Sequence, residues 1–323
     1  MDRGHELTEE LLAGLEKRIA EEYAAAVKDI GEKANAYFAQ FRKDEEAWKA
    51  AVAAGKRTEE DFVKWRFRRE AMGDRWNALK ANLAADLDNA RNIALKMAGE
   101  AMPDVYALNG NFSLYQIESQ GVSLNLALYN HDTAEYLLRQ QRQLMPPPSE
   151  KKAAEIAANK SMQWDASKIQ SAVTQGILQG ESADQIAQRL MKVGEMEYKD
   201  AIRYARTMTT SAQNAGRYES FRRATDLGVN LVIEWVAVLD GHTRDAHRHM
   251  HGERTTVDEP FETPDGYEIY YPADCSGESD APQEEIWNCR CTLIAWVEGF
   301  EGETVRESAG LEGMSFEEWL ESG

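Results

Sequence analysis

The sequence predicts an α+β protein: an elongated, mostly helical N-terminal region followed by a compact domain in which helices pack on a small β-sheet. Two observations carry this prediction. Apolar residues recur at spacings of three and four through most of the first hundred positions, which is typical of helix faces. Two apolar runs rich in β-branched residues, 229–239 and 291–297, are typical of strands. The 323 residues suffice for more than one hydrophobic core.

Long helices account for the N-terminal region. One apolar face extends from Leu7 to Phe41, so we expect a first helix over this range. The sequence Thr58-Glu59-Glu60-Asp61 has the pattern of a capping box, which predicts that a second helix begins there and continues to about Met97. The aromatic residues of this second helix, such as Trp65 and Trp76, are expected in the core.

The middle of the chain contains several helix-breaking residues. The segment 102–130 holds Pro103 and two glycines, so we expect an irregular connection there. Asp132 is expected to cap a helix that ends near Leu144, before a linker at Pro146-Pro147-Pro148. The predicted organisation is therefore an elongated helical domain at 1–145, a linker and lead-in at 146–164, an α+β domain at 165–297 and an acidic tail at 298–323.

The predicted α+β domain begins with helices and ends with strands. We expect helices over 165–178, 183–193 and 195–227, because Gly180, Ser182 and Gly228 supply end signals. The strand at 229–239 is apolar at alternate and at intervening positions, which predicts burial on both faces or nearly so. A short helix at 243–250, a β-turn at Pro264-Asp265-Gly266 and the strand at 291–297 follow.

Charge is distributed unevenly along the chain. The net charge is −19, and residues 231–323 hold 22 acidic against five basic residues. Such a surface suits a basic partner better than a phosphate backbone, or it simply keeps the chain soluble. The tail retains the apolar residues Met314, Phe316, Trp319 and Leu320, which predict a segment that docks on a partner or folds back on its own domain.

No targeting or membrane signal is expected. The N-terminus runs directly into a polar helical pattern without the apolar region of a signal peptide. No apolar run approaches the roughly 18 residues that a membrane span needs. The three cysteines, Cys275, Cys289 and Cys291, are too few and too clustered for a disulfide framework.

Three short motifs follow one another in the second half of the chain. The first, on the helix 195–227, comprises Arg206-Thr207 and Asn214-Ala215-Gly216-Arg217. The second follows the strand with Trp235 and runs from Asp240 to Arg248. The third is Asn288-Cys289-Arg290-Cys291-Thr292-Leu293. The order and spacing resemble the phage head-morphogenesis family, the minor head proteins similar to protein F of phage Mu. The structural residues of the motifs are Arg206, Asn214, Arg217, Asp240, Thr243, Arg244 and Asp245.

The resemblance covers about residues 165–297 and implies a structural protein of a tailed bacteriophage. It implies a minor head (capsid) protein that docks to portal or major capsid subunits during head assembly. The expected location is the virion, at the portal vertex or in the capsid interior, after synthesis in the host cytoplasm. No membrane partner and no resident cofactor are expected. The basic residues Arg206, Arg217, Arg222 and Arg223 leave non-specific contact with packaged DNA open.

A metal site is one interpretation of the cysteines. Cys289 and Cys291 are two apart near a strand, so both side chains point to one face. Together with His247 and either Cys275 or His242 they offer the Cys and His ligands of zinc. The other interpretation is that the thiols pack as small apolar groups while His247 hydrogen-bonds to Asp240 or Asp245. Both interpretations stay open at this point.

Catalysis is the main alternative to a structural role. The histidines beside Asp240 suggest a metal-dependent, nuclease-like DNA-handling enzyme packaged in the head. His247 and His251 would share a helix face, but Arg248 stands where a metalloprotease helix carries Glu. Phosphate loops, dinucleotide fingerprints and an ordered Ser-His-Asp triad are absent. We therefore predict that the chain is not an enzyme and that Arg244 and Asp245 build structure by ion pairing and helix capping.

Overall fold

The computed structural model describes residues 2–140, 151–276, 279–298, 311 and 313–322, with the side chains of 140 and 151–162 left out. The described chain is α+β, as predicted, and forms two compact units assembled from separated segments. Unit 1 comprises Met1–Glu16, Met97–Pro147 and Arg203–Gly323. Unit 2 comprises Lys17–Lys96 and Pro148–Ile202. The predicted linker at 146–148 lies outside the described residues, and the sequential domain limits stay a prediction.

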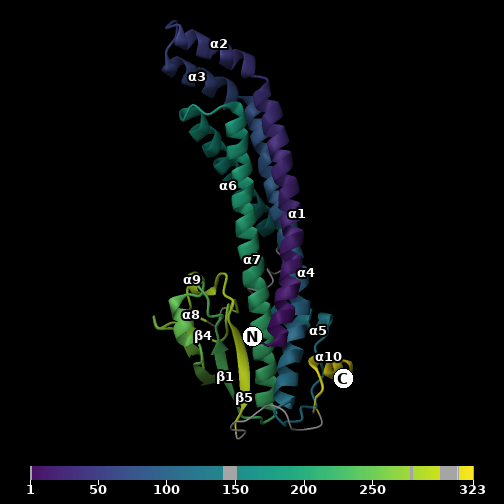
Figure 1. Cartoon of the computed structure of the whole chain (residues 1–323). Helices are drawn as coiled ribbons and strands as arrows, with labels where there is room; N and C mark the ends of the chain where they lie inside the picture. Colours follow the sequence, from purple (N-terminus) through teal and green to yellow (C-terminus); the bar gives the residue numbers. More distant parts are fainter. Residues whose placement is uncertain (1, 141–150, 277–278, 299–310, 312, 323) are drawn as a thin grey trace. The chain divides into compact units, whose positions relative to one another are not determined.

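Unit 2 is built from helices alone in its described part. It contains α2 (Arg42–Ala53), α3 (Glu59–Glu70) and α6 (Lys151–Leu178). It also includes residues of α1 (Arg3–Ala39), α4 (Asp74–Glu118) and α7 (Ala183–Asp226). Figure 1 shows α2 and α3 side by side, and Trp48 of α2 stacks on Phe62 and Trp65 of α3. The core of this unit includes Ile30, Phe38, Trp76, Leu83, Leu87 and Val173, each almost completely buried.

The start of α3 confirms the predicted capping box. Thr58 accepts a hydrogen bond from the Asp61 backbone N–H, and the Asp61 carboxylate accepts one from the Thr58 backbone. The single helix expected from Thr58 to Met97 is wrong, because α3 ends at Glu70 and α4 begins at Asp74. Gly73 adopts φ of +90° between them, a conformation that a helix cannot contain. Helix α2 was not predicted from the sequence.

The irregular connection expected at 102–130 is largely wrong. Helix α4 continues through Pro103 to Glu118. A proline inside a helix costs about 3 kcal/mol. The same part of α4, however, places Tyr106, Leu114 and Ile117 in the core of unit 1. This burial outweighs the local cost. The following helix, α5 (His131–Gln140), is capped by Asn130, whose side chain accepts from the Thr133 N–H, and not by Asp132.

Helix α7 is one continuous helix and not the two predicted at 183–193 and 195–227. Its start has the predicted cap, because Ser182 and Gln185 exchange side-chain and backbone hydrogen bonds. Gly194 does not interrupt it. A Cβ atom at this position would lie 2.6 Å from the Val27 side chain, so this glycine allows close packing inside unit 2.

Unit 1 contains a three-stranded antiparallel sheet with the order β2-β1-β5. The strands are β1 (Leu231–Val236), β2 (Arg254–Thr256) and β5 (Thr292–Val297), and Ile233 of β1 faces Ala295 of β5. In β1 the buried residues alternate with half-buried ones, so one face is fully buried and the other is partly buried. Figure 1 shows β1 and β5 side by side next to α7.

The remaining elements of unit 1 are short. A hairpin joins β3 (Phe261–Glu262) to β4 (Glu268–Ile269), with Gly266 at φ of +82°, as the predicted turn requires. Helices α8 (Asp245–Met250) and α9 (Gln283–Ile286) precede β5. Among the described residues, no helix combines the length and the apolar character that a membrane crossing requires.

The end of the chain folds back on unit 1, one of the two outcomes expected for the tail. Helix α10 (Phe316–Ser322) buries Phe316 and Trp319. The Trp319 indole N–H donates to Glu118 at 2.8 Å, and the Tyr115 hydroxyl donates to the Met314 carbonyl at 2.8 Å. These contacts join the tail to the end of α4.

Candidate metal centre and its supporting network

A buried amide on α7 pairs with the segment that leads into β5. The Asn214 side chain donates to the Cys291 carbonyl at 3.0 Å and accepts from the Leu293 backbone N–H at 3.1 Å. A side-chain amide thus makes the two hydrogen bonds that a neighbouring peptide would make. Because Asn214 is fully buried, loss of this pair would leave two backbone groups without partners.

Arg217, one helical turn further along α7, makes four side-chain hydrogen bonds within unit 1. Its guanidinium donates to the Asn109 side chain at 3.0 Å, to the Leu293 carbonyl at 2.9 Å and to both Asp2 oxygens at 2.7 Å. Burial would raise the pKa of Asp2, but the charge and hydrogen bonds of Arg217 outweigh it and hold this pKa below its usual value. Arg217 therefore acts as a buried, fully engaged cation.

Three further polar side chains of α7 hold the same segment. The Thr207 hydroxyl accepts from the Asn288 N–H at 2.8 Å, the Thr210 hydroxyl donates to the Cys289 carbonyl at 2.8 Å, and Gln213 donates to the Thr292 hydroxyl at 2.9 Å. Thr210 and Gln213 were not among the residues predicted from the motifs. The sequence does contain a sign of their role: a run of small polar residues lies inside a long helix. Such residues are unfavourable in a helix interior, so their presence indicates that their side chains bind partners elsewhere in the fold.

The motif after β1 forms a second set of links. Arg290 donates to both Asp240 oxygens, at 2.7 and 2.6 Å, and its hydrogen bonds hold the pKa of Asp240 well below the usual value. The Thr243 hydroxyl donates to the Val238 carbonyl, and Arg244 donates to the Trp287 carbonyl. Asp245 is the first residue of α8 and its side chain is exposed.

Arg206 lies apart from these links. Its side chain is 43% exposed and pairs with Glu16 within unit 1. The structure thus places Asn214, Arg217, Asp240, Thr243 and Arg244 in bonded positions around the third motif. It places Arg206 and Asp245 toward solvent.

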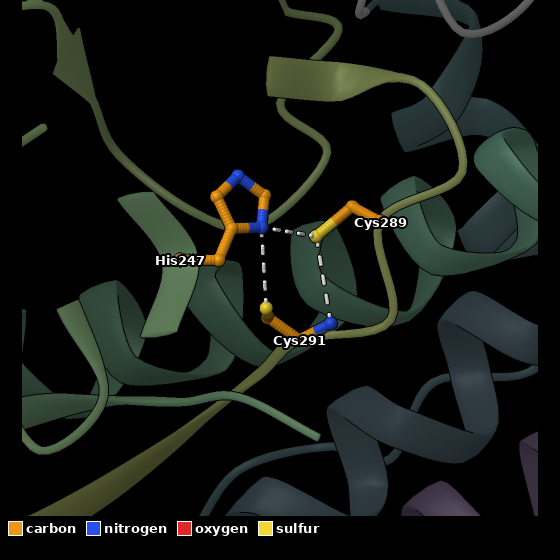
Figure 2. A group of neighbouring side chains, drawn as sticks. All are labelled: His247, Cys289 and Cys291. Atoms are coloured by element: carbon orange, nitrogen blue, oxygen red, sulfur yellow. Dashed lines mark hydrogen bonds between the residues drawn. The ribbon is translucent and has the colours of Figure 1, made fainter. Parts of the chain in front are cut away.

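His247, Cys289 and Cys291 form a buried cluster (Figure 2). The ring nitrogen Nδ1 of His247 lies 3.5 Å from the Cys289 sulfur and 3.4 Å from the Cys291 sulfur. The Cys291 backbone N–H points to the Cys289 sulfur at 3.4 Å. The three donor atoms lie within 4.8 Å of one another, which is close enough for one metal ion to bind all three.

The two other predicted ligands, Cys275 and His242, are not part of this cluster. Cys275 is half-buried, and burial raises the pKa of its thiol to about 11. His242 is exposed and lines a small hollow beside His247 and Cys291. The expectation that His251 shares a helix face with His247 is wrong, because α8 ends at Met250. The backbone of Ala237 donates to the His251 ring instead.

The cluster concentrates charge in a buried place. Burial would raise the pKa of Cys289, but hydrogen bonds with Cys291 and His247 outweigh it and lower this pKa. The hydrogen bond to Cys289, together with burial, raises the pKa of Cys291. Burial would lower the pKa of His247, but Cys289 and Glu285 raise it. The two sulfurs and the imidazole thus compete for protons. Thiolate and imidazole are ligands that suit transition metals such as zinc.

Comparison with known proteins shows which family this part of the chain resembles. Residues 167–294 match the family model described as "Phage Mu protein F like protein". The resemblance predicted from the motifs is confirmed, and all three motifs lie inside the matched range. This part of the chain is therefore similar to phage Mu protein F-like proteins.

Two of the relatives are phage head proteins. The minor head protein GP7 of Bacillus phage SPP1 is 28% identical over 297 residues, which cover 90% of this chain and 84% of the relative. The putative capsid assembly protein F of Escherichia phage Mu is 28% identical over 145 residues, 39% of this chain and 29% of the relative.

A third relative carries an enzyme name. The NAD(+)–arginine ADP-ribosyltransferase EFV of Enterococcus faecalis is 30% identical over 205 residues, 62% of this chain. This chain spans only 39% of that relative's length. No solved structure shows significant similarity to the chain.

Proposed function

We propose that this protein is a minor head protein of a tailed bacteriophage and acts as a structural component during head assembly. The observation that carries the proposal is the similarity to the SPP1 minor head protein, which extends over both units and nearly the whole chain. The Mu capsid assembly protein supports the same role for the domain at 167–294.

The use of the motif residues also supports a structural role. Asn214 and Arg217 bind backbone groups of the segment that leads into β5, and Asp240 binds Arg290 within it. Such hydrogen bonds hold the domain together and leave the side chains no reaction to perform. The proposed mechanism is therefore that of an adapter, which presents its surface to portal or major capsid subunits. We place it in the virion, at the portal vertex or in the capsid interior.

Co-purification tests this proposal directly. The full chain, carrying an affinity tag, is expressed together with the portal protein and separately with the major capsid protein encoded beside it. Stable, stoichiometric co-purification with the portal at moderate salt is the expected result. An unrelated tagged protein of similar net charge serves as the control, because a charge of −19 alone can attract basic proteins. Failure to associate with either subunit, and absence from purified virions, would contradict the proposal.

Activity assays test the proposed absence of catalysis. The same preparation is incubated with DNA with and without divalent metals, and with NAD⁺ and an arginine-containing acceptor. We expect neither cleavage nor ADP-ribosyl transfer. Metal-dependent DNA cleavage that is lost in His247→Ala would instead favour the nuclease-like alternative.

A further inference from the structure

We propose that His247, Cys289 and Cys291 bind one zinc ion through Nδ1 and two sulfurs, with Glu285 as the residue that positions the histidine. This inference goes beyond the proposed structural role, which requires no metal. It rests on four features of the described residues: the distances between donor atoms, the support of the cysteines, the position of Glu285 and the burial of the cluster.

The distances between the donor atoms fit a zinc ion. Zinc bonds of about 2.3 Å to sulfur and about 2.0 Å to nitrogen, at tetrahedral angles, separate nitrogen from sulfur by about 3.5 Å. The observed separations of His247 Nδ1 from the two sulfurs are 3.5 and 3.4 Å. An ion could therefore bind between these atoms with little movement of the side chains.

The two cysteines are supported from both sides. The Cys289 carbonyl accepts from Thr210 and the Cys291 carbonyl accepts from Asn214, so α7 fixes the backbone at both positions. Arg290, between them, is paired with Asp240. The Cys291 N–H that points to the Cys289 sulfur favours the thiolate, which is the form that binds metal. The sulfurs are thus placed before any ion binds.

Glu285 lies on the other side of the imidazole. Its Oε2 lies 3.0 Å from His247 Nε2, an ion-pair distance, and both atoms are buried with no hydrogen bond in the described part of the chain. A histidine that binds metal through one nitrogen commonly gives the proton of the other to a carboxylate. With the proton on Nε2 and facing Glu285, the lone pair of Nδ1 faces the two sulfurs. This carboxylate therefore selects the form of His247 that a metal requires.

Burial gives the cluster a reason to bind a divalent cation. Trp235 packs edge-on against His247, with ring centroids 5.5 Å apart, and both cysteines are at most 2% exposed. Two thiolates and Zn²⁺ together are neutral, which avoids the cost of an uncompensated buried charge. A hollow of about 10 Å³, lined by His242, His247 and Cys291 among others, leaves room for about one water as the fourth ligand.

The first experiment measures metal content in the full chain. After expression with added zinc and dialysis, elemental analysis should find about one zinc per chain. Cys289→Ala and Cys291→Ala should each lose the zinc. Cys275→Ala is the matched control and should keep it, because this third cysteine lies outside the cluster. Glu285→Gln should keep the stoichiometry but weaken zinc affinity about 10- to 100-fold in competition with a chelator.

Two outcomes would overturn the proposal. One is a folded wild-type chain that takes up no zinc and has the same melting temperature with and without chelator. The other is loss of zinc from Cys275→Ala equal to the loss from Cys289→Ala, which would mean a different ligand set. Where the cysteine variants fail to fold, cobalt substitution of the wild-type chain provides the second readout. A tetrahedral, thiolate-bound cobalt spectrum supports the site, and its absence overturns it.

Discussion

The two units use buried polar groups in different ways. In unit 2, cations meet buried carboxylates. The buried Arg66 pairs with Glu45 and Glu70. The half-buried Arg91 pairs with Asp165 and Glu197. In unit 1, the buried polar side chains of α7 bind mainly backbone carbonyls and amides. Both members of an ion pair can be replaced together by apolar side chains. A backbone carbonyl or amide cannot be removed by substitution, so it loses its hydrogen bond when its side-chain partner is replaced. We infer that unit 1 tolerates substitution at these positions less than unit 2 does.

The largest effect is expected from Arg217→Ala. This change removes a fully buried guanidinium and leaves Asp2, Asn109 and the Leu293 carbonyl without their donor. We expect the free energy of unfolding to fall by about 3–5 kcal/mol. Urea denaturation followed by circular dichroism measures it. Arg206→Ala, on the same helix but 43% exposed, is the control and should cost less than about 1 kcal/mol. Equal losses in both variants would contradict the role given to Arg217.

A second test asks whether the buried charged residues Glu45, Arg66 and Glu70 of unit 2 can be replaced together by apolar residues. Arg66→Met leaves two buried carboxylates without a cation and should cost about 3 kcal/mol. The triple variant Glu45→Leu, Arg66→Met, Glu70→Leu should recover most of that loss, because apolar side chains of similar size need no partner. A triple variant no more stable than Arg66→Met would remove the proposed difference between the units.

The triple variant should also differ from the wild type in how its stability depends on pH. Burial and the adjacent Glu45 raise the pKa of Glu70 to about 8, although Arg66 opposes this. The folded chain therefore keeps a proton that the unfolded chain releases above the ordinary value of 4.5. This contribution to stability is present at low pH and is lost as the pH rises through about 8. Between pH 4.5 and about 8, the melting temperature should therefore decline less in the triple variant, which lacks Glu70, than in the wild type.

The smallest of the expected effects concerns the packing of α4 against α7 within unit 1. A Cβ atom at Gly216 would lie 2.3 Å from the Tyr106 carbonyl oxygen, a backbone atom that cannot rotate away. Gly216→Ala should therefore cost about 1–3 kcal/mol. Gly14→Ala, in α1, meets nothing within 4 Å and should stabilise the helix by about 1 kcal/mol. Thermal unfolding of both variants compares them, and a neutral Gly216→Ala would mean that the helices can separate without loss.

Features with local causes were predictable from the sequence. The capping box at Thr58, the turn at Gly266 and the two apolar strands near residues 231 and 292 follow from capping, backbone conformation and side-chain alternation. The motifs from Arg206 to Leu293 identified the family because their order is itself a property of the sequence.

Features with long-range causes were decided by the tertiary structure. Pro103 and Gly194 are helix breakers by local propensity, yet both lie inside long helices, because distant segments bury the surrounding residues. The sequence by itself determined that His247 and the cysteines are chemically suited to a metal. Only the tertiary structure could place Cys289 and Cys291, but not Cys275, beside the imidazole and Glu285 behind it. Contacts between residues about forty positions apart depend on how the intervening chain packs, and local propensity carries no information about that packing.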